Sequence, residues 1–206
     1  MSAKEGRGMR LGIGRTGAIA AMGLMLTGCI SLGGKVPDQL ITLTADETAP
    51  AGDLTGGDAA NAIVVRDPDT DRRLDVTRVP VQTTPSSLAY LKDAMWVEKP
   101  ARQFRRLLAE TIRAKSGKVV LEGSDSEVSG GTTVSGRLVD MGYDAQLQAV
   151  VVRYDAVVET LDGKVRSRRF EAEVPGIPAN AANVGPALNE AANEVAAEVA
   201  DWVIGA

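Results

Sequence analysis

The clearest alternation of apolar and polar residues lies late in the chain, in two runs at residues 150–160 and 164–174. A three-residue Leu-Asp-Gly loop between them, with Gly163 in the left-handed conformation as a bulge, sets Tyr154 opposite Phe170. This register collects apolar pairs on one face of the ladder and opposite charges on the other. We therefore predict a β-hairpin with this register.

The charged face of the hairpin indicates whether its carboxylates are candidates for catalysis. The same register sets Arg153 opposite Glu171 and Asp155 opposite Arg169. A two-residue loop would instead set Tyr154 against Glu171 and apolar residues against polar ones. Because each carboxylate has an arginine partner in the favoured register, we interpret these pairs as structural rather than catalytic.

Helical periodicity appears twice. Pro100 can open a helix that Gly117 ends, and its apolar face consists of Phe104, Leu107, Leu108 and Ile112. The same helix is basic, through Arg102, Arg105, Arg106, Arg113 and Lys115. Those cations fit either binding of anionic lipid or an ordinary solvated face, and we favour the solvated face.

A second helix is expected from Pro186 to about residue 204, with an acidic stripe on its exposed side. Its apolar stripe consists of Leu188, Val195, Val199, Trp202 and Val203, with Ala192 filling the gap. Trp202 fits a membrane-interface anchor or a core aromatic, and we favour the core.

Shorter apolar runs predict the remaining strands. They lie at residues 39–43, 62–65, 74–81, 87–91, 118–121 and 132–141, and residues 45–60 are expected to form a loop. Pro80 places the end of its strand at an edge or a bulge. The fold class is therefore α+β, a largely antiparallel sheet packed against two main helices at about 100–116 and 186–204.

Two scarcities restrict the chemistry. The chain has no histidine and one cysteine, which excludes Ser-His-Asp and Cys-His catalysis and histidine-containing zinc sites. Catalysis by a carboxylate pair stays formally open, but the acidic residues are scattered. We therefore expect no enzyme activity, no cofactor and no metal site.

The N-terminus carries an export signal. A basic start precedes the apolar stretch 18–26, which is shorter than the ~20 residues of a membrane span. The sequence Leu-Thr-Gly-Cys at residues 26–29 resembles the bacterial lipobox. This resemblance implies cleavage between Gly28 and Cys29 and acylation of Cys29. Translation can start at Met1 or at Met9.

Removing residues 1–28 takes four cationic residues and one acidic residue from a formal net charge of −4, which leaves −7. An acidic chain has no electrostatic basis for binding nucleic acid. We expect a signal peptide at residues 1–28, a lipidated tether at 29–36 and a single periplasmic domain at 37–206.

Three short motifs follow the lipobox in a fixed order. They are Leu-Asp-x-x-Arg at residues 74–78, Ala-Tyr-Leu at 89–91 and Trp-x-Glu-x-Pro at 96–100, followed by the leucine-containing helix. In this order and spacing the chain resembles the ABC-type transport auxiliary lipoproteins, including the paraquat-inducible lipoprotein C group. It departs from them in the Ala/Gly/Asp-rich loop and in Met95, where arginine is common.

The resemblance implies a non-catalytic partner of a phospholipid-transport system. The partner would be a membrane-anchored protein of the mammalian-cell-entry class, which forms the lipid conduit. Ile30 after the anchor, in place of an inner-membrane retention Asp, suggests the outer membrane. Tyr90 and Trp96 are candidate partner contacts, with core packing as their alternative, and self-association into a homo-oligomer stays open. The competing function is a structural lipoprotein for assembly of an outer-membrane barrel or for lipopolysaccharide export.

Overall fold

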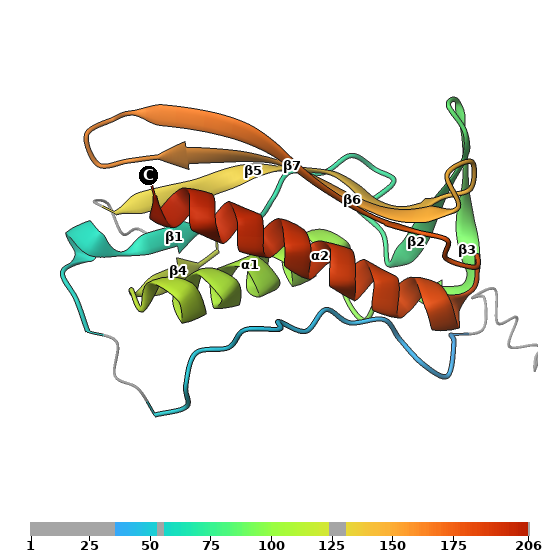
Figure 1. Ribbon diagram of the computed structural model, residues 1–206, viewed down its shortest axis with the longest axis horizontal. Helices are drawn as coiled ribbons and strands as arrows, with labels where there is room; N and C mark the ends of the chain where they lie inside the picture. Colours follow the sequence, from blue (N-terminus) through green and yellow to red (C-terminus); the bar gives the residue numbers. More distant parts are fainter. Residues whose placement is uncertain (1–35, 53–55, 124–130, 206) are drawn as a thin grey trace, which may run out of the picture. The chain divides into compact units, whose positions relative to one another are not determined.

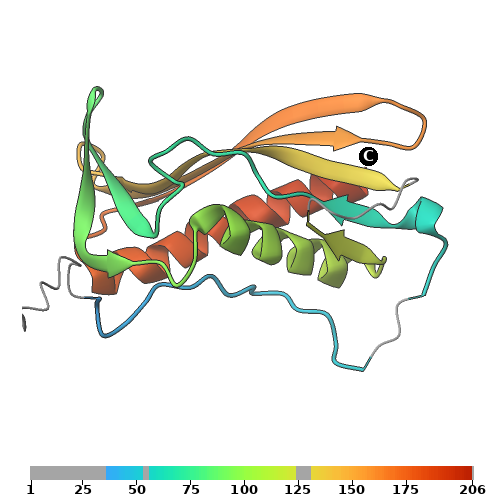
Figure 2. The same cartoon turned by 180° about the vertical axis from the view of Figure 1, so that it is seen from behind.

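The computed structural model describes residues 36–52, 56–123 and 131–205. Cys29, Gly28 and the rest of the expected signal and tether up to residue 35 lie outside this part. The described chain is α+β, with one seven-stranded sheet whose helices lie on one side (Figures 1 and 2). The expected fold class is confirmed.

The elements follow in a simple order. They are a 3₁₀ turn (Ala59–Asn61), β1 (Ile63–Val65), β2 (Arg78–Thr84), β3 (Ser87–Met95), α1 (Pro100–Ser116), β4 (Val120–Glu122), β5 (Thr132–Asp144), β6 (Ala149–Glu159), β7 (Val165–Pro175) and α2 (Ala181–Ile204). Antiparallel pairing joins β2 to β3, β5 to β6 and β6 to β7, whereas β1 pairs in parallel with β4 and β5.

The sheet divides at β5. One edge of β5 pairs with β6 along its whole length, and its other edge is shared by β1 at the start and β2 at the end. The sheet therefore has two ends. We call the end with the β2–β3 and β5–β6 turns the near end. We call the end with β1, β4 and the β6–β7 turn the far end.

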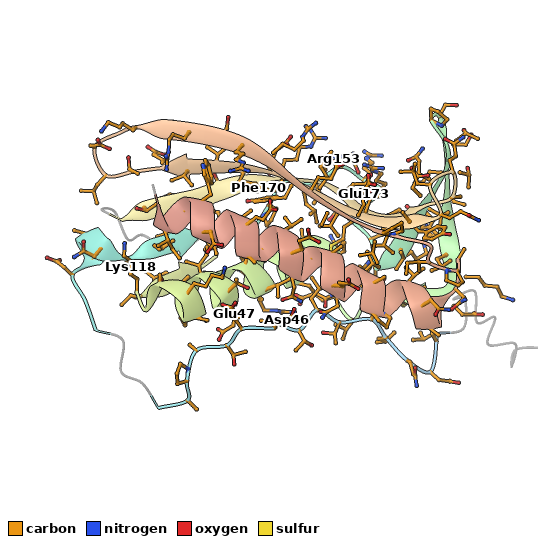
Figure 3. All side chains as sticks on the ribbon, viewed as in Figure 1. Asp46, Glu47, Lys118, Arg153, Phe170 and Glu173 are labelled. Atoms are coloured by element: carbon orange, nitrogen blue, oxygen red, sulfur yellow. The ribbon has the colours of Figure 1, made fainter. Side chains whose placement is uncertain are left out.

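The hairpin has the predicted register. Tyr154 pairs with Phe170, and on the other face Arg153 pairs with Glu171. Gly163 has a φ of 78°, the left-handed conformation that the three-residue loop requires. Figure 3 shows Phe170 on the helix side of the sheet and Arg153 on the opposite side.

The core lies between the helix side of the sheet and the two helices. Phe104 of α1 packs on Tyr154 with ring centroids 5.0 Å apart, and Phe170 of β7 meets Trp202 of α2 at 5.6 Å. Burial of the Tyr154 phenol raises its pKa. Trp202 is half-buried and packs against the core, which confirms the core interpretation of this residue.

Helix α1 occupies its predicted span. Pro100 stands in its first turn, where a missing N–H costs nothing, and Gly117 ends it at a φ of 62°. The start of α2 was predicted wrongly. Asn180 caps the helix with its side chain, so α2 begins at Ala181 and Pro186 lies inside it. An Asx cap decided the boundary, and Pro186 removes one early intrahelical hydrogen bond.

Two predicted strands were also wrong in extent. Residues 39–43 form no strand, and only Ile41 makes a single bridge, to Trp96. Residues 74–77 form turns, so β2 begins at Arg78. Pro80 does not lie at a sheet edge, because β2 lies between β3 and β5, but it adjoins a register shift, which confirms the expected bulge.

Residues 36–52, here called the strap, run in extended form along both helices (Figure 3, with Asp46 and Glu47 labelled). Side chains of the helices hold its backbone. The Leu43 N–H donates to Gln103 Oε1 at 3.0 Å, and the Asp46 N–H donates to Asn193 Oδ1 at 3.0 Å. Asn193 Nδ2 returns a bond to the Thr44 carbonyl at 2.9 Å.

Candidate functional site

The three sequence motifs meet in space. The backbone N–H of Trp96 donates to the Thr77 carbonyl at 2.7 Å, which joins the third motif to the first. Lys99 Nζ donates to Asp75 Oδ1 at 2.6 Å and ties the same two motifs through side chains. The antiparallel pairing of β2 and β3 brings the second motif beside them, because Pro80 pairs with Tyr90.

An open cleft lies where the first and third motifs meet, with a volume of ≈ 460 Å³. We call it the motif cleft. Its lining consists of Asp67, Pro68, Thr70, Asp75, Thr77, Glu98, Lys99, Ala101 and Arg102. The loop after β1 forms one wall and the first turn of α1 forms the other.

The charges around this cleft are largely paired. Glu98 lies 3.6 Å from Arg102 and 2.6 Å from Arg106, and Arg105 lies 3.3 Å from Asp67. Farther along α1, Lys115 pairs with Asp201 of α2 at 2.8 Å. The cations of α1 therefore have acidic partners within the domain, which supports the solvated-face interpretation over binding of anionic lipid.

The two aromatic candidates have different environments. Trp96 is 1% exposed, so it belongs to the core and offers no side-chain surface to a partner in this structure. Tyr90 is half-buried on β3, and the Arg78 guanidinium stacks over its ring at 3.8 Å. Arg78 is exposed, so the pair presents a flat cationic and aromatic surface beside the motifs.

The carboxylates of the hairpin are held by arginines. The hydrogen bond from Arg169 lowers the pKa of Asp155, and the bond from Arg153 lowers the pKa of Glu171. Asp140 on β5 differs, because desolvation raises its pKa although Arg73 lies 3.6 Å away. Within the described residues no cluster of three or more His, Cys, Asp or Glu has the geometry of a metal site.

Sequence reasoning missed the motif cleft and the amides that hold the strap. Asp67 and Thr70 lie in a loop without periodicity, so nothing local marks them. A signal for the amides existed: Asn189 and Asn193 are spaced i, i+4 beside the apolar stripe of α2, and Asn193 is buried. Buried amides need partners, which the strap supplies.

Neither helix in the described part of the chain combines the length and apolar character that a membrane span requires. The comparison with curated proteins finds no match. Solved structures share the fold. A crystal structure of an uncharacterized protein has a TM-score of 0.62 at 13% identity, covering 80% of this chain and 99% of that one.

Protein XCC0632 from Xanthomonas campestris, described as family DUF330, has a TM-score of 0.61 at 20% identity. The similarity covers 81% of this chain and 94% of that one. The family model for the ABC-type transport auxiliary lipoprotein component matches residues 42–200, a span that includes all three motifs and the motif cleft. The chain therefore belongs to the ABC-type transport auxiliary lipoprotein family.

Proposed function

We propose that this protein is a non-catalytic auxiliary component of an ABC-type phospholipid transport system of the mammalian-cell-entry class. It is anchored at the outer membrane through Cys29 and docks the periplasmic lipid conduit. The observation that carries the proposal is the family match over residues 42–200, within which the three motifs lie side by side in the fold.

The side chains of the described residues support a binding role. Asp75, Glu98, Asp155 and Glu171 each lie against a lysine or arginine of the domain. The arginine partners lower the pKa of Asp155 and of Glu171, so these two carboxylates stay charged near neutral pH and are poor proton donors. The chain also has no histidine to act as a general base.

Anchoring would follow from acylation of Cys29, the only thiol of the chain. Several acyl chains hold a protein far more firmly than one, at about 0.8 kcal/mol per buried CH₂. Cys29→Ala should abolish labelling by a fatty-acid analogue, and undiminished labelling would refute the anchor. Density fractionation should place the wild-type chain with outer-membrane markers. The Ile30→Asp variant should move to the fractions with inner-membrane markers.

Tyr90 is the proposed docking contact, because tyrosine is enriched among interface hot spots and the Arg78 stack holds this ring at the surface. Tyr90→Ala should weaken capture of the conduit protein at least ten-fold, which corresponds to about 1.4 kcal/mol. Leu161→Ala, an exposed change at the far end, is the control and should leave capture unchanged.

The stability of Tyr90→Ala decides how the capture result is interpreted. A melting temperature close to wild type with weaker capture supports docking, whereas unaltered capture removes Tyr90 from the interface. Co-purification of the wild-type chain with a barrel-assembly protein instead of a conduit would refute the transport assignment and favour the assembly role.

A further inference from the structure

Among the described residues, most of the exposed large apolar side chains lie at the two ends of the sheet. At the near end they are Val36, Leu40, Leu88 and Leu147; at the far end they are Leu161, Val165 and Ile204. Val97 is also exposed and follows β3, where its N–H donates to the Ile41 carbonyl of the strap at 2.9 Å. Leu147 lies in the β5–β6 turn and Leu88 directly after the β2–β3 turn. The Ala145 N–H donates to the Gln82 carbonyl at 2.9 Å, so these two turns lie together.

The strap determines from which end the N-terminal segment leaves the domain. Ile41 lies against the first turns of α2, where a Cβ built on Gly185 would be 3.5 Å from it. The strap then follows α2 toward its C-terminus, from Asn189 to Asn193. The start of α2 belongs to the near end, because the Ile177 N–H donates to Gln148 of the β5–β6 turn at 3.0 Å. Figure 1 shows the strap entering there.

The tether is short compared with the domain. From Cys29 to Val36 the chain advances seven residues, which span at most about 25 Å when fully extended. Strand β6, of 11 residues, alone separates the two ends by about 36 Å. A domain with its far end on the bilayer would hold Val36 beyond the reach of its anchor.

The long sides of the domain are poor surfaces for a bilayer. Helix α2 exposes Glu190, Glu194 and Glu198, and the outer face of the hairpin carries Arg153 and Glu171. Placing these charges against lipid would desolvate them at considerable cost. The near end instead offers aliphatic side chains in one turn, at Leu147, and directly after the adjacent turn, at Leu88. Such side chains gain free energy on leaving water.

We propose that the near end of the domain rests on the lipid bilayer, with Leu147 and Leu88 as the side chains that contact lipid. The proposal rests on the acylation of Cys29 put forward above. The strap acts as the orienting element, because its hydrogen bonds to α1 and α2 fix the tether at this end. The far end, with Leu161 and Val165, points away from the membrane.

The test uses single cysteines in the full-length acylated protein. Because Cys29 carries the lipid, an introduced cysteine is the only free thiol. Leu147→Cys and Leu88→Cys report on the near end, and Leu161→Cys is the matched control. Leu161 also lies in a hairpin turn next to β6 and has a similar exposure, 60% against 55% for Leu147. Each variant is labelled with an environment-sensitive fluorophore and incorporated into phosphatidylcholine vesicles, with or without phosphatidylglycerol.

Labels at positions 147 and 88 should show a blue shift on incorporation and lose intensity when the vesicles contain a lipid-borne quencher. The label at 161 should show neither effect. Equal quenching at 161 and 147 would overturn the proposal in favour of a domain lying flat, and no response at 147 and 88 would also overturn it. A response that requires phosphatidylglycerol would refute an apolar contact. Thiol labelling of the wild-type chain would show that Cys29 is free, which refutes the anchor separately.

Discussion

The β6–β7 hairpin and the strap are both extended, but they are held in opposite ways. The hairpin closes through a three-residue loop, and its two strands bond to each other from Ala149 to Pro175. The strap bonds to no strand along most of its length. Its partners are side chains of α1 and α2 that lie between 60 and 149 residues away in the sequence.

This difference has consequences for stability. Closing a short loop costs little entropy, so the hairpin can form early in folding, before the helices have packed. The strap can bind only after both helices have packed, because Gln103 and Asn193 come from different helices. We therefore expect the hairpin to share the global stability of the domain and the strap to open locally at lower free energy.

The largest effect should come from breaking the core side of the hairpin. Phe170→Ala removes a ring that is 2% exposed, lies opposite Tyr154 in the ladder and contacts the Trp202 ring. The expected loss is about 3–5 kcal/mol of unfolding free energy, measured by chemical denaturation. Val165→Ala, an exposed change on the same strand, should cost little. A loss below about 1 kcal/mol for Phe170→Ala would contradict the packing described here.

Releasing the strap should cost less. Asn193→Ala removes the acceptor of the Asp46 N–H and the donor to the Thr44 carbonyl, so we expect a loss of about 1–3 kcal/mol. Hydrogen exchange should accelerate at Asp46 and not at Tyr154. Asn189→Ala, which removes one exposed bond to Thr44, is the control and should have a smaller effect. Equal acceleration in strap and hairpin would show that the two regions open together.

The turn of the hairpin allows a test of backbone strain without a change in side-chain packing. A Cβ at Gly163 would meet nothing within 4 Å, but the φ of +78° is unfavourable for alanine. Gly163→Ala should therefore cost about 1 kcal/mol through strain, seen as a lower denaturation midpoint with an unchanged slope. Gly56→Ala, also in open space and without a positive φ, should be neutral or slightly stabilising. A neutral Gly163→Ala would refute the left-handed loop.

The smallest effect concerns the exposed charges of the hairpin. The Arg153 hydrogen bond lowers the pKa of Glu171, so this ion pair adds stability above the unfolded pKa of about 4.3 and loses it as pH falls through the folded value. Glu171→Gln should cost less than about 1 kcal/mol at pH 7 because the pair is partly solvated. Denaturation curves of variant and wild type should converge in acid, and a gap that widens there would contradict the sign.

The sequence alone determined the parts of this protein whose information is local. Period-two alternation and a glycine-ended loop specified the register of Tyr154 with Phe170, and helical periodicity between Pro100 and Gly117 specified α1. Three motifs behind a lipobox were enough to indicate the family that the match over residues 42–200 shows. Each of these signals lies within a few turns of chain, where spacing translates directly into geometry.

Only the tertiary structure decided the strap, the start of α2 and the motif cleft. Residues 39–43 have the composition of a strand, but they form only the single bridge from Ile41 to Trp96, and Leu43 meets a helix side chain instead of a ladder. The helix α2 starts after Asn180 and not at Pro186, because the Asn180 side chain caps it. Composition alone does not show which of the two residues marks the start. The cleft joins Asp75 to Lys99 across 24 residues. Such contacts depend on which distant surfaces meet after the core has packed, and no local period encodes that choice.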